Sequence, residues 1–183
     1  MPNLYHLVLF AHVSGDIGIF VSLGIQLVSM AVLRRAQTIE QARVLVRLIH
    51  LSDSLSVISV LLTLATGLYM ALTVWNLQIG WIAVSLASLI LLMPPLIQAL
   101  VEPRMRMIMK MVKEAPDGPL PEPLYKRLHD PVLSIGLHTT TALVFGIVFL
   151  MTTKPALVGS IVVIAFALIL GIVSGLPIRR QSR

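Results

Sequence analysis

Five ionisable side chains interrupt the long apolar stretches of this sequence: His12, Asp16, His50, Asp53 and His138. If these stretches cross a membrane, each such group costs about 2.5–3.5 kcal/mol on insertion scales and therefore needs a partner or a purpose. Neutral imidazole is a common metal ligand, and a nearby carboxylate can orient it by accepting a hydrogen bond from its other ring nitrogen. The pattern indicates a metal or cofactor site within apolar helices.

His12 and Asp16 are four residues apart and therefore lie on the same face of a helix. The Asp16 carboxylate could accept a hydrogen bond from the imidazole and fix its tautomer. The alternative is a self-satisfied polar pair that faces neighbouring helices. His12 lies about 12 Å below the outer edge of its span, so it could serve a second site or act alone as an axial ligand.

His50 and His138 lie on different predicted helices but at matching depth. Counted from the inner ends of their spans at Val44 and Pro131, both are roughly 9–11 Å above the same edge. Two imidazoles at one level can clamp a haem iron from both faces, with Asp53 as an acceptor that orients one of them. This arrangement predicts b-type haem, and the alternative for both histidines is hydrogen-bonded packing between helices.

Two weaker sets of potential ligands have simpler explanations. His6 and His129 fall at predicted membrane interfaces, where a solvated or headgroup-facing ring is expected. A run of methionines with period-two spacing suggests Cu(I), which thioethers select. That spacing spreads the sulfurs around a helix and basic residues separate them, so an amphipathic helix on the membrane surface is the better interpretation. The methionines are Met105, Met107, Met109 and Met111.

The composition shows which elements must position these groups. Of 183 residues, 57% are hydrophobic and 12% charged, and the mean hydropathy is +0.93. A soluble domain has roughly 25% charged residues, and a core of this length could not hide so much apolar surface, so a soluble globule is excluded. The absence of cysteine excludes disulfides, thiolate metal sites and covalent c-type haem. We expect an all-α, polytopic membrane helix bundle that forms a single transmembrane domain over residues 1–183.

Five spans follow from the apolar runs, since a bilayer core takes about 20 helical residues. Trp75 and Trp81 flank a break and serve as interfacial anchors. The Pro94–Pro95 pair should kink the third span because two backbone donors are missing. The hairpin 153–155 is so short that the last two helices must be antiparallel neighbours. The predicted spans are 4–33, 44–75, 80–103, 131–153 and 155–178, with a cytoplasmic linker at 114–124 between a three-helix and a two-helix half.

The basic residues define an orientation. Thirteen of the fourteen Lys and Arg residues fall on one side of the predicted spans, and Lys154 falls on the other. Because Lys and Arg concentrate in cytoplasmic loops, the N-terminus is expected outside and the C-terminus in the cytoplasm. The same asymmetry explains the formal net charge of +6 without nucleic-acid binding. The sequence predicts a multi-pass protein of the bacterial inner, cytoplasmic membrane.

Small residues predict where helices pack closely. Ser14, Gly18 and Ser22 repeat every four residues in the first span, and Gly171 and Gly175 do so in the fifth. Such seams allow close approach of another helix, which could belong to this chain, to a second copy or to another membrane protein. The alternative function is therefore a non-catalytic membrane subunit or assembly factor.

Several short motifs follow one another from about Leu4 to Pro155. They are His12-x-x-Gly15, Arg47-x-x-His50-x-x-Asp53, Thr66-Gly67-Leu68-Tyr69-Met70, Arg104-Met105-Arg106, Leu120-Pro121 with Tyr125 and Arg127, and Leu150-Met151 with Lys154-Pro155. In this order they resemble the predicted integral membrane proteins of domain-of-unknown-function family 2269.

That family is similar, at a distance, to haem-binding membrane protoporphyrinogen oxidases and to copper-resistance-D-like proteins. The resemblance implies that His12 stands where the oxidases have a first-helix histidine implicated in haem binding. The third span here contains no lysine, which departs from the oxidases, so their activity is not carried over. We expect a membrane protein that binds b-type haem and acts in redox or haem-related chemistry, with copper handling a weaker alternative.

Overall fold

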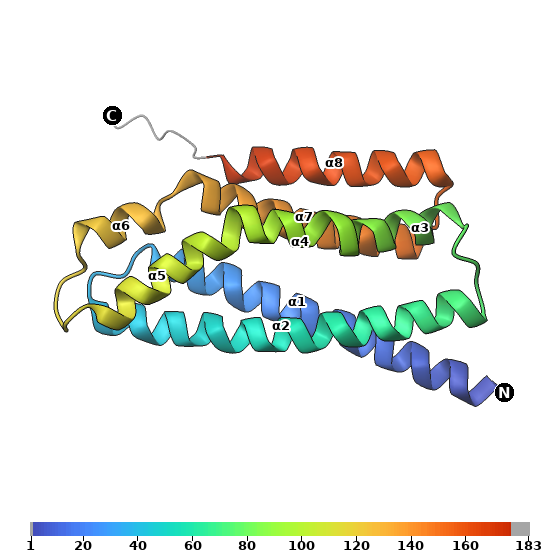
Figure 1. Cartoon of the computed structure of the whole chain (residues 1–183), viewed down its shortest axis with the longest axis horizontal. Helices are drawn as coiled ribbons and strands as arrows, with labels where there is room; N and C mark the ends of the chain where they lie inside the picture. The colour runs from blue at the N-terminus through green and yellow to red at the C-terminus, as the bar shows by residue number, and fades with distance from the viewer. Residues whose placement is uncertain (1, 177–183) are drawn as a thin grey trace. The chain divides into compact units, whose positions relative to one another are not determined.

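Helices form the regular structure of residues 2–176, the part of the chain that the computed structural model describes, with side chains from residue 4 on. No strand occurs in that part, where a single β-bridge joins Thr38 and Pro119. The prediction of an all-α protein is confirmed. In chain order the helices are α1 (Pro2–Leu33), α2 (Ile39–Thr73), α3 (Gly80–Ala87), α4 (Met93–Leu96), α5 (Glu102–Glu114), α6 (Glu122–Leu128), α7 (Pro131–Thr153) and α8 (Leu157–Gly175) (Figure 1).

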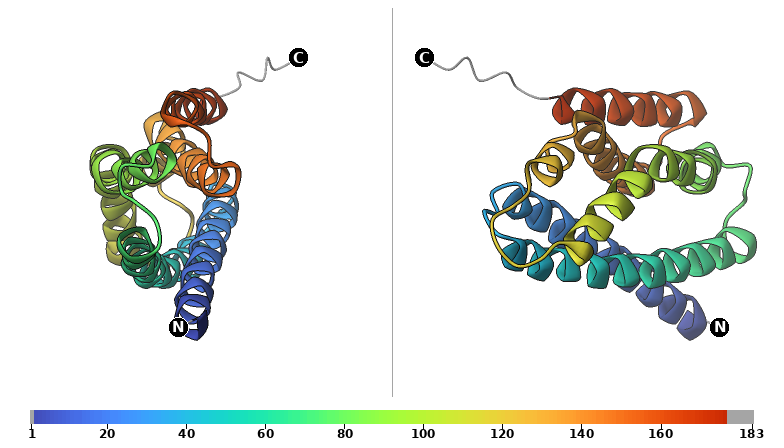
Figure 2. Two further views of the ribbon diagram at one scale, coloured as in Figure 1. Left: turned by 90° about the vertical axis from the view of Figure 1, so that its right-hand side faces the viewer. Right: turned by 60° about the vertical axis from the view of Figure 1, so that its left-hand side comes forward.

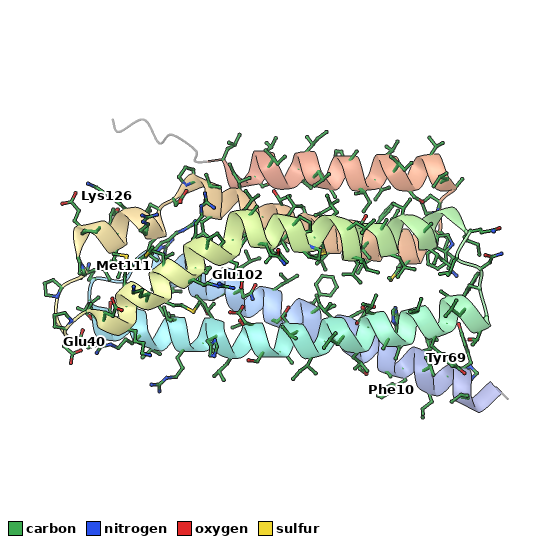
Figure 3. The ribbon with its side chains drawn as sticks, viewed as in Figure 1. Phe10, Glu40, Tyr69, Glu102, Met111 and Lys126 are labelled. Atoms are coloured by element: carbon green, nitrogen blue, oxygen red, sulfur yellow. The ribbon has the colours of Figure 1, made fainter. Side chains whose placement is uncertain are left out.

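Five helical stretches of the described chain are long and apolar enough to cross a membrane: Leu4–Leu33, Ile39–Thr73, Gly80–Glu114, Glu122–Thr153 and Leu157–Gly175. Their large apolar side chains also face outward, as Figure 3 shows along α8, where Val158 and Phe166 are 73% and 65% exposed. Such a surface is stable only in contact with lipid. The five predicted transmembrane helices are confirmed, and the protein is a multi-pass integral membrane protein in contact with the bilayer.

The predicted start of a span and the observed start of its helix agree best where the helix begins with a capping residue followed by proline. Asp130 accepts a hydrogen bond from the Val132 amide at 2.8 Å and Pro131 follows it, so α7 starts at the predicted residue. The start of α2 was predicted five residues late, because Thr38 caps the helix through the Gln41 amide and the charged first turns are helical too. The fifth helix begins at Leu157, and its predicted end at residue 178 lies outside the described residues.

Helical structure continues from Gly80 to Glu114, past the predicted end of the third span at residue 103. The prolines at 94 and 95 disrupt its hydrogen bonding as expected, and the disruption takes the form of two π-helical segments, η1 (Ser88–Leu92) and η2 (Ile97–Val101). Beyond the second segment, α5 carries Met105, Ile108 and Val112 as a buried stripe while its lysines are exposed. This is the amphipathic continuation that the sequence predicts.

The helices form two compact units, and the division differs from the predicted one between three helices and two. One unit holds α1 and α2 with Met111–Pro121, and the other holds the chain from Gln78 to Lys110 and from Glu122 on. The third span belongs with α7 and α8 because Gly80 packs on the backbone of Leu157 and Gly136 packs on Leu100 and Val101. Each unit is described by itself below.

In the first unit, α1 and α2 lie side by side (Figure 1 and Figure 2). His12 contacts Gly67, whereas Gln26 contacts Asp53, so the numbers rise along α1 as they fall along α2 and the helices are antiparallel. The segment between α5 and α6 pairs with the turn before α2, where the Ile39 amide donates to the Gly118 carbonyl at 2.9 Å. Gly118 has a φ of 138°, a conformation that favours glycine.

The first unit is also closed by Arg43, which donates hydrogen bonds to Asp117 and, at 2.6 Å, to the Ala115 carbonyl. The amide of Leu120 donates to the Gln37 carbonyl at 2.8 Å. We call these contacts of residues 115–120 with residues 37–43 the linker clasp. The predicted linker is therefore ordered along its non-helical part, and α6 begins within the predicted range at Glu122.

In the second unit, α7 and α8 are neighbours, as the short hairpin predicts (Figure 2). A left-handed Lys154, with φ 50°, ends α7 and starts the return. Its ammonium group lies over the Trp81 ring, 5.8 Å from the ring centroid. At the other end of α7, Arg104 bonds the Asp130 carboxylate at 3.1 Å, which ties the start of α5 to the start of α7.

Candidate functional site

A set of polar contacts surrounds His12, at the interface of α1 and α2. His12 is 8% exposed, and its Nδ1 lies 3.0 Å from the Thr63 carbonyl oxygen and 3.1 Å from the Thr66 hydroxyl. Thr66 donates its own proton to the Leu62 carbonyl, so both neighbours of Nδ1 act as acceptors. We therefore place the ring proton on Nδ1, which leaves a lone pair on Nε2.

Asp16 lies on the other side of the His12 ring. Its Oδ1 accepts a hydrogen bond from the Thr63 hydroxyl at 3.1 Å, and its Oδ2 is 3.9 Å from Nε2 of His12. This separation is within reach of an ion pair but too long for a hydrogen bond. The Thr63 carbonyl, rather than the Asp16 carboxylate expected from sequence, sets the imidazole tautomer. Thr63 thus contacts both members of the pair.

Glycines bring the two helices close enough for these contacts. A Cβ on Gly67 would lie 2.9 Å from Cε1 of His12, and a Cβ on Gly15 would meet the Thr63 hydroxyl. Gly18 packs in the same way on Ser59. The small-residue seam predicted in the first span is confirmed as a packing surface, and α2 of the same chain occupies it.

A second polar contact joins the same helices nearer to their connecting turn. The side-chain amide of Gln26 donates a hydrogen bond to Oδ1 of Asp53 at 2.5 Å. Asp53 was expected to orient His50, one turn away, but the recorded hydrogen bond of its carboxylate is to Gln26. The His50 side chain is exposed, and its ring makes no hydrogen bond within residues 2–176.

His138 lies on α7 in the second unit and is half-buried. Its Nδ1–H donates to the Ser134 carbonyl at 2.8 Å, which leaves Nε2 as the lone-pair nitrogen. The adjacent Thr139 hydroxyl oxygen is buried without a hydrogen-bond partner among the described residues. His50 and His138 belong to different units, so their match in depth stays a prediction from the sequence.

The remaining potential ligands include His129 and the methionines of α5. His129 is exposed, donates to the Tyr125 carbonyl at 2.9 Å and stacks on the Tyr125 ring, with ring centroids 4.2 Å apart. Met105 is buried whereas Met107 is 43% exposed, so these neighbouring sulfurs face different directions. Residues 2–176 contain no group of three or more His, Asp or Glu side chains that could hold a metal ion.

Sequence reasoning missed the residues of α2 that complete the His12 cluster, and it missed Gln26. Ser59, Thr63 and Gly67 recur every four residues, the same spacing as Ser14 and Gly18 in the first span. A search for complementary small-residue stripes on consecutive spans could have paired them. Gln26 could have been identified as a candidate for a contact between helices, because its polar amide lies in an otherwise apolar run.

The fold and these buried polar contacts define a class: a helical, multi-pass integral membrane protein with ionisable groups inside its spans. The family model described as "Predicted integral membrane protein (DUF2269)" matches residues 6–155. The chain belongs to this family, and the match covers the region in which the motifs were found. No curated protein and no solved structure matches the chain.

Proposed function

We propose that this membrane protein binds a b-type haem and that His138 is an axial ligand of its iron. The observation that carries the proposal is the anchored ring of His138, whose Nδ1–H is held by the Ser134 carbonyl while Nε2 stays free. A ligating histidine almost always donates its other N–H to a carbonyl or carboxylate in this way. When bound, the haem would supply a one-electron redox centre inside the membrane.

Comparison of the histidines supports His138 as the ligand. The Nδ1 of His129 is anchored equally, but its residue is exposed and its ring is stacked on Tyr125, before the start of α7. The ring of His12 is enclosed between two helices packed through glycine, and its Nε2 already faces a carboxylate. A flat macrocycle at His12 would have to separate these helices, so we leave His12 out of the ligand set. His50 enters only through the sequence, which predicts it at the same depth as His138, and it is therefore tested as well.

Visible absorption of the protein, purified in detergent from haem-supplied cells, tests the proposal. We expect a Soret band that shifts on reduction. His138→Ala should lose haem or change the iron coordination, and His50→Ala should convert a six-coordinate to a five-coordinate spectrum. His129→Ala, in which an equally anchored ring is removed, should leave the spectrum unchanged. A colourless protein without bound iron, or identical spectra for His138→Ala and His129→Ala, would contradict the proposal.

The alternative function, a non-catalytic subunit that docks to a partner, receives less support from the same structure. This alternative was based on the small-residue seams of the first and fifth spans, and other helices of the same chain pack against glycines of both seams. Gly18 packs on Ser59 of α2, and Gly171 packs on Thr139 of α7. A partner would have to use another surface.

We also propose that the protein lies in an inner, cytoplasmic membrane, with its N-terminus on the external side and its C-terminus in the cytoplasm. The proposal is supported by the concentration of Lys and Arg in the loops after the first and third spans. Reporter fusions provide the test. A fusion after Arg183 should be active as a cytoplasmic reporter, and one at Asn76 as an external reporter. A reversed pattern would overturn the orientation.

A further inference from the structure

If His12 is neutral and Asp16 is ionised, the two side chains present acceptor atoms to each other. With the ring proton on Nδ1, the Nε2 of His12 is an acceptor. The nearest polar atom on that side is Oδ2 of Asp16 at 3.9 Å, and an ionised carboxylate is an acceptor too. Two acceptors face each other, and one additional proton would join them by a hydrogen bond after a small side-chain movement.

The charge of the surroundings leads to the same conclusion. The stretch of α2 packed against the pair, from Ser59 to Gly67, has no ionisable side chain. From Leu7 to Leu33, α1 has none besides the pair itself. The nearest ionisable groups on α2 are Asp53 and the exposed Tyr69 (Figure 3). Without the additional proton, the site would hold a net negative charge inside a membrane span, with no counter-charge beside it.

We propose that His12 and Asp16 together form a proton-binding site inside the membrane. The site takes up one proton from water and holds it either on Nε2, as an imidazolium beside a carboxylate, or on Oδ2, as a carboxylic acid beside a neutral imidazole. Both forms are neutral overall. The proposal does not depend on haem binding, because neither His12 nor Asp16 belongs to the ligand set proposed above.

Thr63 makes this site suitable for reversible binding. Its carbonyl holds the Nδ1 proton of His12, and its hydroxyl donates to Oδ1 of Asp16. The hydroxyl therefore stabilises the carboxylate when the proton leaves, while the carbonyl keeps the imidazole in one tautomer. Intramembrane pairs of this kind serve proton transfer in pumps and transporters. The chemistry assigned to the site is the uptake and release of a proton without any change in covalent bonds.

Two spectroscopic measurements on the full chain in lipid nanodiscs test the proposal. In a sample with ¹⁵N-labelled histidine rings, NMR reports whether both ring nitrogens of His12 carry protons. Infrared spectroscopy reports the C=O stretch of a protonated carboxyl. We expect one of these two signals at neutral pH and its loss as the pH is raised. In Asp16→Asn, which keeps the side-chain shape, the signal should be absent.

Control variants separate the pair from other groups. Asp53→Asn removes a carboxyl group of α2 that lies outside the pair, and it should leave the signal of the pair unchanged. Thr63→Val removes the hydroxyl but keeps the carbonyl, so it should shift the signal toward the carboxylic acid form. The proposal is overturned if wild-type protein shows a neutral His12 ring beside an ionised Asp16 at neutral pH. It is equally overturned if the signal survives in Asp16→Asn or does not respond to pH.

Discussion

The helix pairs α1/α2 and α7/α8 both depend on glycine for close packing, but their interfaces differ in polarity. Between α7 and α8, Gly171 meets the backbone of Thr139 and Gly175 meets that of Ile135. Between α1 and α2, glycines instead lie against polar side chains, as Gly67 does against His12. At Gly171 and Gly175 the α7/α8 interface is a contact of backbones, whereas the α1/α2 interface also brings polar side chains against its glycines.

One hydroxyl group of α2, that of Thr63, is also used differently from those of α7 and α8. On α7 and α8, Thr140, Thr141 and Ser174 donate to carbonyls of their own helices. On α2, by contrast, Thr63 donates across the interface to Asp16. Hydroxyls that bond to their own helix add little to helix association, so α7 and α8 are held mainly by van der Waals contact.

The difference indicates why the α1/α2 interface is a candidate site. Close packing of small residues is sufficient to associate two helices in this protein, as α7 and α8 demonstrate. Ionisable groups inside a span cost insertion free energy and are not needed for that purpose. The proton-binding site proposed above would give the His12 and Asp16 pair a role beyond association, and the following variants test this distinction.

The largest effect is expected where a side chain is added between two backbones. In Gly171→Ala the new Cβ would meet the Cα of Thr139 and lie 3.0 Å from its amide nitrogen, and a helix backbone cannot yield. Helices α7 and α8 must move apart, at a cost of about 1–3 kcal/mol in the free energy of unfolding. Thermal unfolding in detergent measures it. Gly24→Ala, where nothing lies within 4 Å of the added Cβ, should stay within about 0.5 kcal/mol of wild type.

A smaller effect is expected in the polar interface, because there a side chain can move. In Gly67→Ala the new Cβ would lie 2.9 Å from Cε1 of His12, so the ring must shift away from Thr63 and Thr66. We expect a loss of about 1 kcal/mol, the low end for overpacking. The His12 ring ¹⁵N signals should change at the same time, whereas Gly171→Ala should leave them in place. If both variants destabilise the protein equally without any change at His12, the proposed difference between the interfaces is wrong.

Removing one hydroxyl should have a smaller effect still. Thr63→Val deletes the donor to Asp16, and hydrogen bonds between membrane helices contribute about 0.6 kcal/mol on average. The matched variant Thr141→Val deletes a hydroxyl that bonds within α7 and should be nearly neutral. A double-mutant cycle of Thr63→Val with Asp16→Asn isolates the pairwise contribution. Equal costs for the two threonines would show that the cross-helix bond contributes nothing specific.

The sequence predicted the number of spans because the length and hydropathy of a span are local properties. The predicted start of the fourth span at residue 131 is also the first residue of α7. The contacts between spans depend on how each helix is rotated about its axis, which hydropathy does not determine. The depth of His50 from the inner end of its span could therefore be estimated, but its exposure could not. For the same reason, the pairing of Gln26 with Asp53 could not be predicted. The linker clasp was missed for the same reason, since it joins segments more than 70 residues apart.

The linker clasp provides the smallest expected effect, because its contacts lie in water rather than in lipid. The side chains of Arg43 and Asp117 are 40% and 66% exposed, and exposed ion pairs contribute about 0–1 kcal/mol. Arg43→Gln should leave the free energy of unfolding within about 0.5 kcal/mol of wild type. Hydrogen exchange at the amides of Ile39 and Leu120, which close the clasp, should nevertheless become faster. Arg106→Gln, which breaks an exposed ion pair within α5, should leave these two amides unchanged. A global loss of stability in Arg43→Gln as large as that of Gly171→Ala would show that a contact in water can matter as much as one between packed helix backbones.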